Sequence, residues 1–426
     1  MRGARSRLAI LRRAALACSP PVARPPSRPP DDRLPHCRHF GVCGGCSLLD
    51  QPIAWQLRDK QAACERLLAP FLGQVPLQFD EPRHTPVHHR TKLLYPVRAG
   101  RSGEPLVGIY AYQSHHVVRI EECRTQDRWL TQLGQVMEKE LRMQRLAPWS
   151  SARGEGHVKS IWARLAAGTG EVCAGIVTRP GAFPAGQAFA EAVLAGAAGI
   201  PQLRHERRLV GVVHGITERD DDFLLADRHV PLRGRDHVLD HRDGLWFKVS
   251  AGSFYQVHAG AHALLYGPAI AMCGDVRGKR VVDGYGGVGG FGLRLARAGA
   301  AHVTIVEDNA AACRDARHNA ERNQLPNVTV VESPFPAARL PANTDLLVVD
   351  PPRSGLQTQG VARVLATRAT SVLYVSCSAD SLARDLAGLA NDYEVRAARL
   401  CDLFPHTEHA ELAVLLASRT AKPTTN

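Results

Sequence analysis

Val281-Val282-Asp283 runs directly into the glycine-rich stretch Gly284-Tyr285-Gly286-Gly287-Val288-Gly289-Gly290-Phe291. The apolar residues fit the end of a buried strand, and the glycines let the following loop take positive φ and approach a ligand closely. A second apolar run, His302 to Val306, ends in Glu307. An acid at the tip of the second strand typically binds a ribose diol. The pattern predicts a nucleotide-type cofactor site at the edge of a parallel sheet.

Two later strand ends carry polar or reactive groups. Leu346 to Val349 ends in Asp350-Pro351-Pro352-Arg353, and Val372 to Val375 runs into Ser376-Cys377-Ser378. A cysteine after a strand is more often a core residue than a nucleophile. Here the neighbouring motifs and a later glutamate, Glu411, favour an exposed nucleophile. From about residue 262 onward, predicted strands alternate with helices of about 10–15 residues, which is typical of a doubly wound α/β fold.

The rest of the chain suggests three parts, residues 1–36, 37–245 and 246–420. The first is rich in arginine and proline and reads as a disordered basic tail, with a transit peptide as the competing interpretation. The second predicts an α+β region behind a cysteine-rich loop, and the third is the α/β domain. In the middle part, antiparallel strands are expected from about Thr85 to Val118. Later strands are expected at residues 158–164, 171–177, 209–213 and 223–225. Helices are expected at residues 53–68, 125–145 and 185–197.

Composition narrows the class of partner. The 426 residues carry a formal net charge of +12, which suggests an anionic partner, usually a nucleic acid. A solvated basic surface without a partner explains the charge equally well. No apolar run approaches the roughly 18–20 residues needed to span a bilayer. We therefore expect a cytoplasmic protein with no membrane association and no evident obligate protein partner.

Four of the eleven cysteines form a candidate metal site. Cys37, Cys43 and Cys46 are separated by five and two residues, and Cys123 follows much later. Four thiolates can hold an iron–sulfur cluster or zinc. The spacing lacks the paired knuckles of a zinc ribbon, which favours the cluster. Cys64 is an alternative fourth ligand, although its predicted place on a helix disfavours it.

Taken together, these motifs resemble the 5-methyluridine RNA methyltransferases that act on ribosomal or transfer RNA. The resemblance covers about Cys37 to Leu416. It rests on the cysteine set, on the glycine-rich loop and on five further stretches: His89-Arg90-Thr91-Lys92, Ser253-Phe254-Tyr255-Gln256-Val257-His258, Asp350-Pro351-Pro352-Arg353, Tyr374-Val375-Ser376-Cys377, and Phe404-Pro405-His406-Thr407-Glu408-His409-Ala410-Glu411. Some members begin with a β-barrel RNA-binding domain, and only 36 residues precede Cys37, so the chain resembles the shorter subgroup.

The resemblance implies a role for each matched residue. S-adenosylmethionine would be bound by Gln256, Tyr285, Glu307 and Asp350, with Cys377 as nucleophile and Glu411 as base. Cys37, Cys43, Cys46 and Cys123 would hold a four-iron, four-sulfur cluster. The substrate would be RNA, with 23S ribosomal RNA favoured over transfer RNA because the transfer RNA enzymes often lack the cysteine motif.

The chemistry agrees with these residue types. Carbon 5 of uracil is a poor nucleophile until a thiolate adds to carbon 6, after which a base must remove the carbon 5 proton. Cytosine-5 enzymes typically place a cysteine directly after a proline of the strand-four motif, and position 352 is proline. Two other hypotheses stay open, an iron–sulfur oxidoreductase that binds a nicotinamide and a non-catalytic RNA-binding protein.

Overall fold

We analysed a computed structural model, which describes residues 34–80, 86–202, 206–221 and 223–420. The expected tail, apart from residues 34–36, and the expected strand start at Thr85 lie outside the described residues. The chain divides into two compact units, residues 1–34 and 35–426, and the fold below is that of the second unit.

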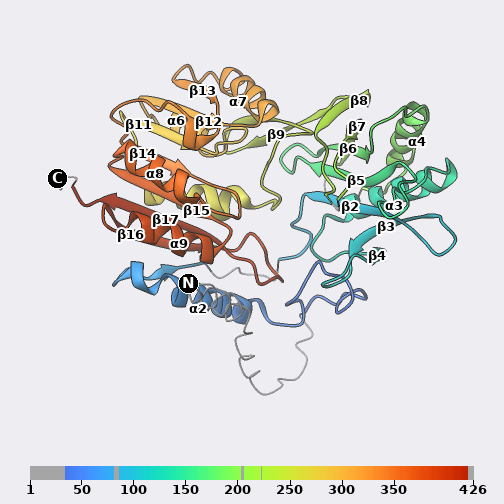
Figure 1. The fold of residues 1–426 in the computed structure, drawn as a ribbon, viewed down its shortest axis with the longest axis horizontal. Helices are drawn as coiled ribbons and strands as arrows, with labels where there is room; N and C mark the ends of the chain where they lie inside the picture. Colours follow the sequence, from blue (N-terminus) through green and yellow to red (C-terminus); the bar gives the residue numbers. More distant parts are fainter. Residues whose placement is uncertain (1–33, 81–85, 203–205, 222, 421–426) are drawn as a thin grey trace, which may run out of the picture. The chain divides into compact units, whose positions relative to one another are not determined.

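The C-terminal half forms an eight-stranded sheet in the order β1-β16-β17-β15-β14-β11-β12-β13 (Figure 1). Strands β11 to β15 run parallel, while β17 is antiparallel to both β15 and β16. The strands are β1 (Leu77–Gln78), β11 (Arg280–Gly284), β12 (His302–Glu307), β13 (Val328–Glu332), β14 (Leu346–Val349), β15 (Ser371–Ser376), β16 (Tyr393–Cys401) and β17 (Glu411–Ser418).

Helices cover both faces of this sheet, as a doubly wound fold requires. Successive residues of one strand enter different cores: Leu346 and Val348 of β14 belong to one, and Leu347 and Val349 to the other. The helices are α5 (Gly267–Met272), α6 (Gly292–Arg297), α7 (Ala310–Arg322), α8 (Gln357–Thr367) and α9 (Ala379–Leu389), with a π-helical turn η2 (His262–Tyr266) and a 3-10 turn η3 (Phe335–Ala337). The predicted α/β class is therefore confirmed.

An early segment of the chain completes the C-terminal core. Helix α2 (Ile53–Leu72) packs its apolar stripe, including Leu57 and Leu68, into the same core as α8 and α9. After it, β1 pairs in parallel with β16, Leu77 opposite Ala398. Figure 1 shows α2 beside β16 and α9. Residues from the predicted central part thus belong physically to the C-terminal sheet.

The middle of the chain forms a seven-stranded mixed sheet in the order β4-β3-β2-β5-β6-β7-β8. Only β6 and β7 are parallel, because α4 connects them. Helices α3 and α4 pack on one face of the sheet. These elements are β2 (Lys92–Ala99), β3 (Pro105–Tyr110), β4 (Val117–Arg119), α3 (Arg128–Met143), β5 (Val158–Leu165), β6 (Glu171–Thr178), α4 (Gly186–Ala198), β7 (Arg208–Ile216) and β8 (Arg228–Gly234).

One predicted strand is wrong. Residues 223–225 are irregular, and the next strand begins only at Arg228. The Phe223 amide donates to Asp221 Oδ1, and the Leu224 carbonyl accepts from the Ser160 hydroxyl. Side chains therefore satisfy backbone groups that a strand would have paired.

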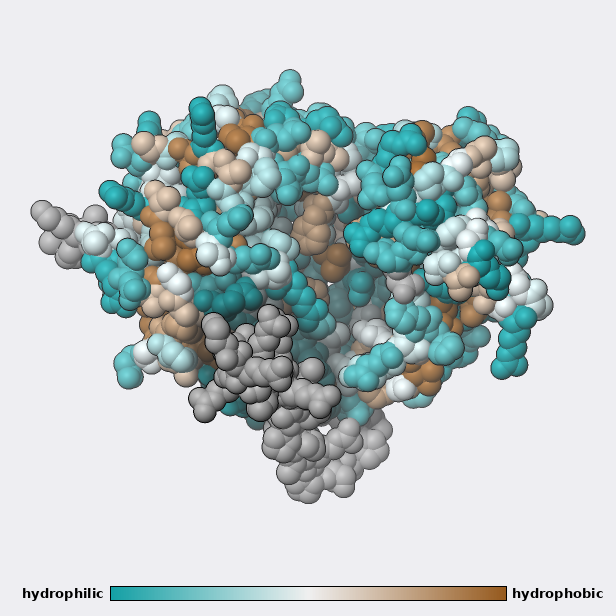
Figure 2. All heavy atoms as spheres, viewed as in Figure 1, coloured by the Kyte–Doolittle hydropathy of each residue, from teal (hydrophilic) through white to brown (hydrophobic). Residues whose placement is uncertain are grey.

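A hairpin joins the two halves of the chain. It consists of β9 (His237–Arg242) and β10 (Leu245–Ser250), and β10 packs on α7. In the described residues, no helix combines the length and the apolar character needed to cross a membrane. The face drawn in Figure 2 carries hydrophilic residues interspersed with small hydrophobic areas.

Candidate active site and thiol cavity

The candidate site lies where parallel strands end at one edge of the C-terminal sheet. β11, β14 and β15 are neighbours, so the residues that follow them, Tyr285, Asp350 and Cys377, leave the sheet along the same edge. β17 runs antiparallel to β15, with Leu412 opposite Ser376. Its first residue, Glu411, is thereby placed beside the end of the cysteine strand.

The glycine-rich loop adopts the backbone that its sequence predicts. Tyr285 has φ +62°, and Gly287 and Gly289 have φ +56° and +95°. Glu307 braces the loop, since its Oε2 accepts a 2.9 Å hydrogen bond from the Gly287 amide. The Tyr285 ring lies 5.2 Å from that of Phe335, centroid to centroid. Phe335 was not among the site residues expected from the sequence. The one sequence feature that could have indicated it is its position shortly after β13.

Three carboxyl groups at this edge resist ionisation. Burial raises the pKa of Asp283 to about 7, with Asp350 adding to the shift. Burial also raises the pKa of Asp350 to about 7. The pKa of Glu411 lies well above its usual range because of burial and the nearby Asp350. Asp283 Oδ2 accepts from the Gly292 amide at 2.7 Å, while its buried Oδ1 has no partner. The edge therefore favours a cationic ligand.

Cys377 is partly exposed, as a nucleophile must be. Burial raises the pKa of its thiol, and Glu411 and Asp350 raise it further. Arg353 lowers that pKa, but the opposing effects outweigh it. The net direction of the shift favours the thiol over the thiolate.

Gln256 lies in the segment between β10 and η2, which neighbouring elements hold at several points. Both the amide and the hydroxyl of Thr91 donate to the Val257 carbonyl, at 2.7 and 2.9 Å. On the other side, Asn309 Nδ2 donates to the Gly252 carbonyl at 3.3 Å. Asn309 lies two residues after Glu307, the acid predicted to bind the cofactor ribose. The segment that contains Gln256 therefore contacts the turn after β12. Within this segment, Phe254 is 65% exposed.

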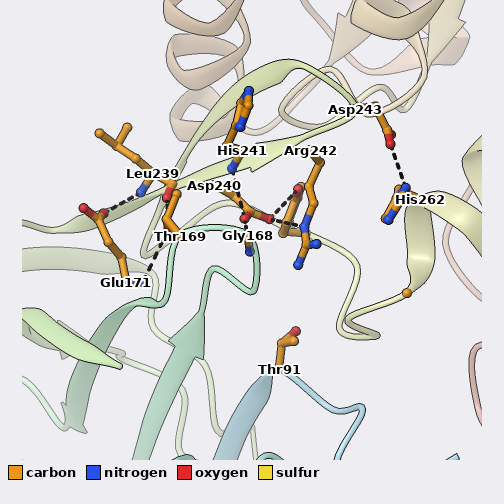
Figure 3. Close-up of polar contacts among 12 residues, drawn as sticks. Thr91, Gly168, Thr169, Glu171, Leu239, Asp240, His241, Arg242, Asp243 and His262 are labelled. Atoms are coloured by element: carbon orange, nitrogen blue, oxygen red, sulfur yellow. Dashed lines mark hydrogen bonds and ion pairs between the residues drawn. The ribbon is translucent and has the colours of Figure 1, made fainter. Parts of the chain in front are cut away.

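Gln256 lines a small cavity of about 20 Å³. Asp240 and Arg242 of β9 also line it. Figure 3 shows Asp240 pointing at Gly168, whose amide donates to Asp240 Oδ1 at 2.7 Å. Asp243 pairs with His262 at 2.7 Å in the same view. These contacts fix the hairpin against the end of β5 and against η2, and so support the Gln256 segment.

The four predicted metal ligands line one cavity of about 530 Å³, together with Thr407, Glu408 and His409. The thiols influence one another, since burial and then Cys123, Cys43 and Cys37 raise the pKa of Cys46 to about 12. Among the described residues, no group of three or more His, Cys, Asp or Glu is arranged to hold a metal ion. The alternative ligand, Cys64, is buried in the core between α2 and the C-terminal sheet.

The fold and the cofactor edge together define the class: an S-adenosylmethionine-dependent methyltransferase with a Rossmann-like domain. Residues 341–419 match the family model of tRNA (uracil-5-)-methyltransferases, and residues 253–377 match the methyltransferase small domain. The chain belongs to the RNA uracil-5-methyltransferase family and is an S-adenosylmethionine-dependent RNA methyltransferase, which confirms the resemblance seen in the motifs.

The individual relatives agree with this placement. An uncharacterised RNA methyltransferase of Listeria monocytogenes is 31% identical over 90% of this chain and 84% of its own length. One from Leptospira interrogans is 27% identical over 88% and 96%. The crystal structure of the Pyrococcus abyssi tRNA (uracil-54, C5)-methyltransferase with S-adenosyl-L-homocysteine has the same fold. It aligns with a TM-score of 0.69 at 22% identity, covering 88% of this chain and 86% of the other.

Proposed function

We propose that this protein methylates carbon 5 of a uridine in RNA through a covalent intermediate on Cys377. The observation that carries the proposal is the meeting of Cys377 and Glu411 beside Asp350 and Arg353 at one sheet edge, where each acid affects the Cys377 thiol electrostatically. Covalent activation of a pyrimidine requires this combination of a thiol, a base and a polar group for the developing charge.

The proposed reaction has two parts, addition of a thiolate to the uracil and removal of a proton from it, and one residue of the chain carries out each. The Cys377 thiol releases its proton to solvent, and the resulting thiolate adds through its sulfur to carbon 6 of the uracil, which makes carbon 5 nucleophilic. S-adenosylmethionine supplies the methyl group for carbon 5. Glu411 then accepts the carbon 5 proton, and the bond between sulfur and carbon 6 breaks to restore the aromatic ring. Glu411 must be ionised to accept this proton, and its raised pKa makes it a stronger base once it is ionised.

The cofactor edge fits a cationic methyl donor. Asp283 and Asp350 are costly to ionise without a positive partner, and the sulfonium and ammonium groups of S-adenosylmethionine would provide one. We assign Gln256, Tyr285, Glu307 and Asp350 to binding it. Tyr285 would stack on the cofactor from its position against Phe335.

Four cysteines from two distant stretches line one cavity, and four thiolates can hold an iron–sulfur cluster or zinc. The spacing of the first three cysteines lacks the paired knuckles of a zinc ribbon, which favours the cluster. We propose that Cys37, Cys43, Cys46 and Cys123 hold a four-iron, four-sulfur cluster in a structural role.

RNA containing 5-fluorouridine tests the covalent step. Fluorine at carbon 5 cannot leave as a proton does, so the adduct persists and migrates as a protein–RNA band under denaturing conditions. We expect the band with wild type and with Cys273→Ala, a cysteine outside the site, but not with Cys377→Ala. A band of equal intensity in Cys377→Ala would refute the role of this thiol.

The RNA substrate needs a separate experiment. The cysteine set favours 23S ribosomal RNA, whereas the matched family model and the Pyrococcus abyssi relative carry names that specify transfer RNA. Mapping 5-methyluridine in both RNA pools, from cells with and without the gene, distinguishes the two. Loss of the mark from ribosomal RNA alone supports our assignment, and loss from transfer RNA alone overturns it.

A further inference from the structure

The segment Asp402–Ala410 links the two candidate sites. It joins β16 to β17, and Glu411 follows it directly as the first residue of β17, opposite Cys401. His409 Nδ1 lies 3.4 Å from Arg353 Nη2 at the active site, and His409 also lines the thiol cavity. The conformation of this segment therefore sets the surroundings of the predicted base.

Two buried polar side chains of helix α2 form hydrogen bonds with the segment. Gln56 and Lys60 lie one helical turn apart on the same face, and they are 0% and 4% exposed. Gln56 Oε1 accepts from the His406 amide at 2.8 Å. Lys60 Nζ donates to Asp402 Oδ1 at 2.7 Å and to the Phe404 carbonyl at 2.9 Å. One helix face thus holds three alternate residues of the segment.

The hydrogen bonds of His406 fix its tautomer. Its Nε2 lies 2.7 Å from the Pro86 carbonyl, which can only accept, so Nε2 carries the proton. Nδ1 lies 3.2 Å from Gln56 Nε2, which donates to the Leu48 and Gln51 carbonyls at 2.8 Å each. The His406 carbonyl also accepts from the amides of Ser47 and Leu48, at 3.0 Å each. His406 has φ +67°, a conformation that an L residue keeps only where its surroundings enforce it.

These polar contacts define position more than they add stability. A buried lysine–aspartate pair gains little over apolar packing, because both charges lose their water. Here Asp402 Oδ2 is buried with no hydrogen-bond partner, so the pair is not even fully satisfied. Directional bonds specify one arrangement of a loop, whereas apolar contacts at the same places would tolerate several.

We propose that Gln56 and Lys60 are positioning residues that hold Asp402–Ala410 and thereby aim Glu411 at the carbon 5 proton. The inference rests on the proposed function, since it assigns these residues to the proton-removal step. Cys377 follows β15, whereas Gln56 and Lys60 form the hydrogen bonds described above with the segment before β17. Loss of these hydrogen bonds should therefore slow removal of the carbon 5 proton and leave the addition of Cys377 to carbon 6 intact.

The two RNA substrates separate these steps. With 5-fluorouridine RNA, adduct formation requires Cys377 and the methyl donor but no removal of a proton from carbon 5. With uridine RNA, turnover also requires the base. We expect Gln56→Leu to lower kcat on uridine RNA roughly 10- to 100-fold, the usual effect of misplacing a catalytic group. We expect it to form the 5-fluorouridine adduct at close to the wild-type rate and to accumulate an adduct on uridine RNA.

Matched variants control for a general structural effect. Gln61→Leu removes a glutamine of the same helix that bonds to the Leu77 carbonyl instead, and it should match wild type in both assays. His406→Gly removes the side chain that Gln56 holds while suiting the positive φ, so it should show the same split as Gln56→Leu even if that variant folds poorly. Affinity for S-adenosylhomocysteine should be unchanged in each variant.

The outcomes distinguish the two proposals. Equal loss of uridine turnover and of 5-fluorouridine adduct in both Gln56→Leu and His406→Gly overturns the positioning role and leaves the proposed function standing. Unchanged kcat in both variants overturns it as well. If wild type itself forms no adduct, the covalent mechanism fails and the inference fails with it.

Discussion

At the scale of single residues, the defining feature is a group of acids held close together with little compensating charge. Asp283, Asp350 and Glu411 all have raised pKa values because burial disfavours their charged forms. Such perturbed groups gather where chemistry needs a particular protonation state. In the function we propose, they favour a cationic methyl donor and make Glu411 a stronger base once it is ionised.

Removal of the base should stop the reaction after methyl transfer. Glu411→Gln keeps the size of the side chain but cannot accept the carbon 5 proton, so we expect kcat to fall by roughly 10²–10⁴. The methylated adduct should accumulate on ordinary uridine RNA, which denaturing gel electrophoresis would detect. Wild-type turnover in this variant would exclude Glu411 as the base.

Affinity for the methyl donor should depend on pH. Asp283 and Asp350 have pKa values of about 7, so both become ionised as pH rises through neutrality, and a cation binds the ionised forms better. We expect the Kd for S-adenosylmethionine to rise as pH falls from about 8 to 6, by up to about tenfold per unit for each linked proton. Isothermal titration calorimetry would measure it. S-adenosylhomocysteine lacks the sulfonium and should show a weaker dependence, and equal dependence for both ligands would contradict this account.

At the scale of elements, helix α2 has two different functions on one face. Leu57, Leu68 and Leu72 fill the core beside α8 and α9, while Gln56 and Lys60 hold the segment before β17. The apolar residues stabilise the fold through burial, and the polar residues fix the position of the segment through directional hydrogen bonds. The helix therefore belongs energetically to the C-terminal sheet, although the chain enters it long before that sheet begins.

Two adjacent leucines of α2 test this assignment. Leu68 is fully buried and Leu67 is 40% exposed. Leu68→Ala should lower the free energy of unfolding by about 2–5 kcal/mol, and Leu67→Ala should change it by less than about 0.5 kcal/mol. Urea denaturation followed by circular dichroism would measure both. Equal effects would show that α2 does not pack as described.

At the scale of the whole molecule, the cysteine loop and the C-terminal sheet meet at one segment. Ser47, which follows Cys46 directly, donates to the His406 carbonyl, and the thiol cavity includes residues just before Glu411. The division into residues 1–36, 37–245 and 246–420 remains a prediction. The packing of α2 and β1 adds that the second of these parts contributes elements to the third.

The metal content of the purified protein tests the proposed cluster. Anaerobically purified wild type should contain iron and acid-labile sulfide and absorb visible light, and Cys46→Ala should lose all three because one of four ligands is missing. Cys64→Ala should keep them, since Cys64 lies in the apolar core. Stoichiometric zinc in the wild type would replace the iron assignment.

The sequence alone indicated the α/β class of the C-terminal domain and the order of its candidate functional motifs. Strand periodicity, glycines that require positive φ and residues at strand ends are local features, so a single stretch such as Val281 to Phe291 carries its own structural information. The family follows from the same stretches. The wrong strand at 223–225 shows the limit of local pattern, because side-chain bonds from Asp221 and Ser160 satisfied the backbone there.

Only the tertiary structure decided which distant residues act together. Gln56 and His406 are 350 positions apart, and no local pattern marks Gln56 as different from the other polar residues of its helix. The raised pKa values of Asp283, Asp350 and Glu411 likewise depend on burial and on one another, which arise when three separate strands meet at one edge. Sequence pattern specifies elements, whereas contacts between elements determine the electrostatics and positioning on which the chemistry depends.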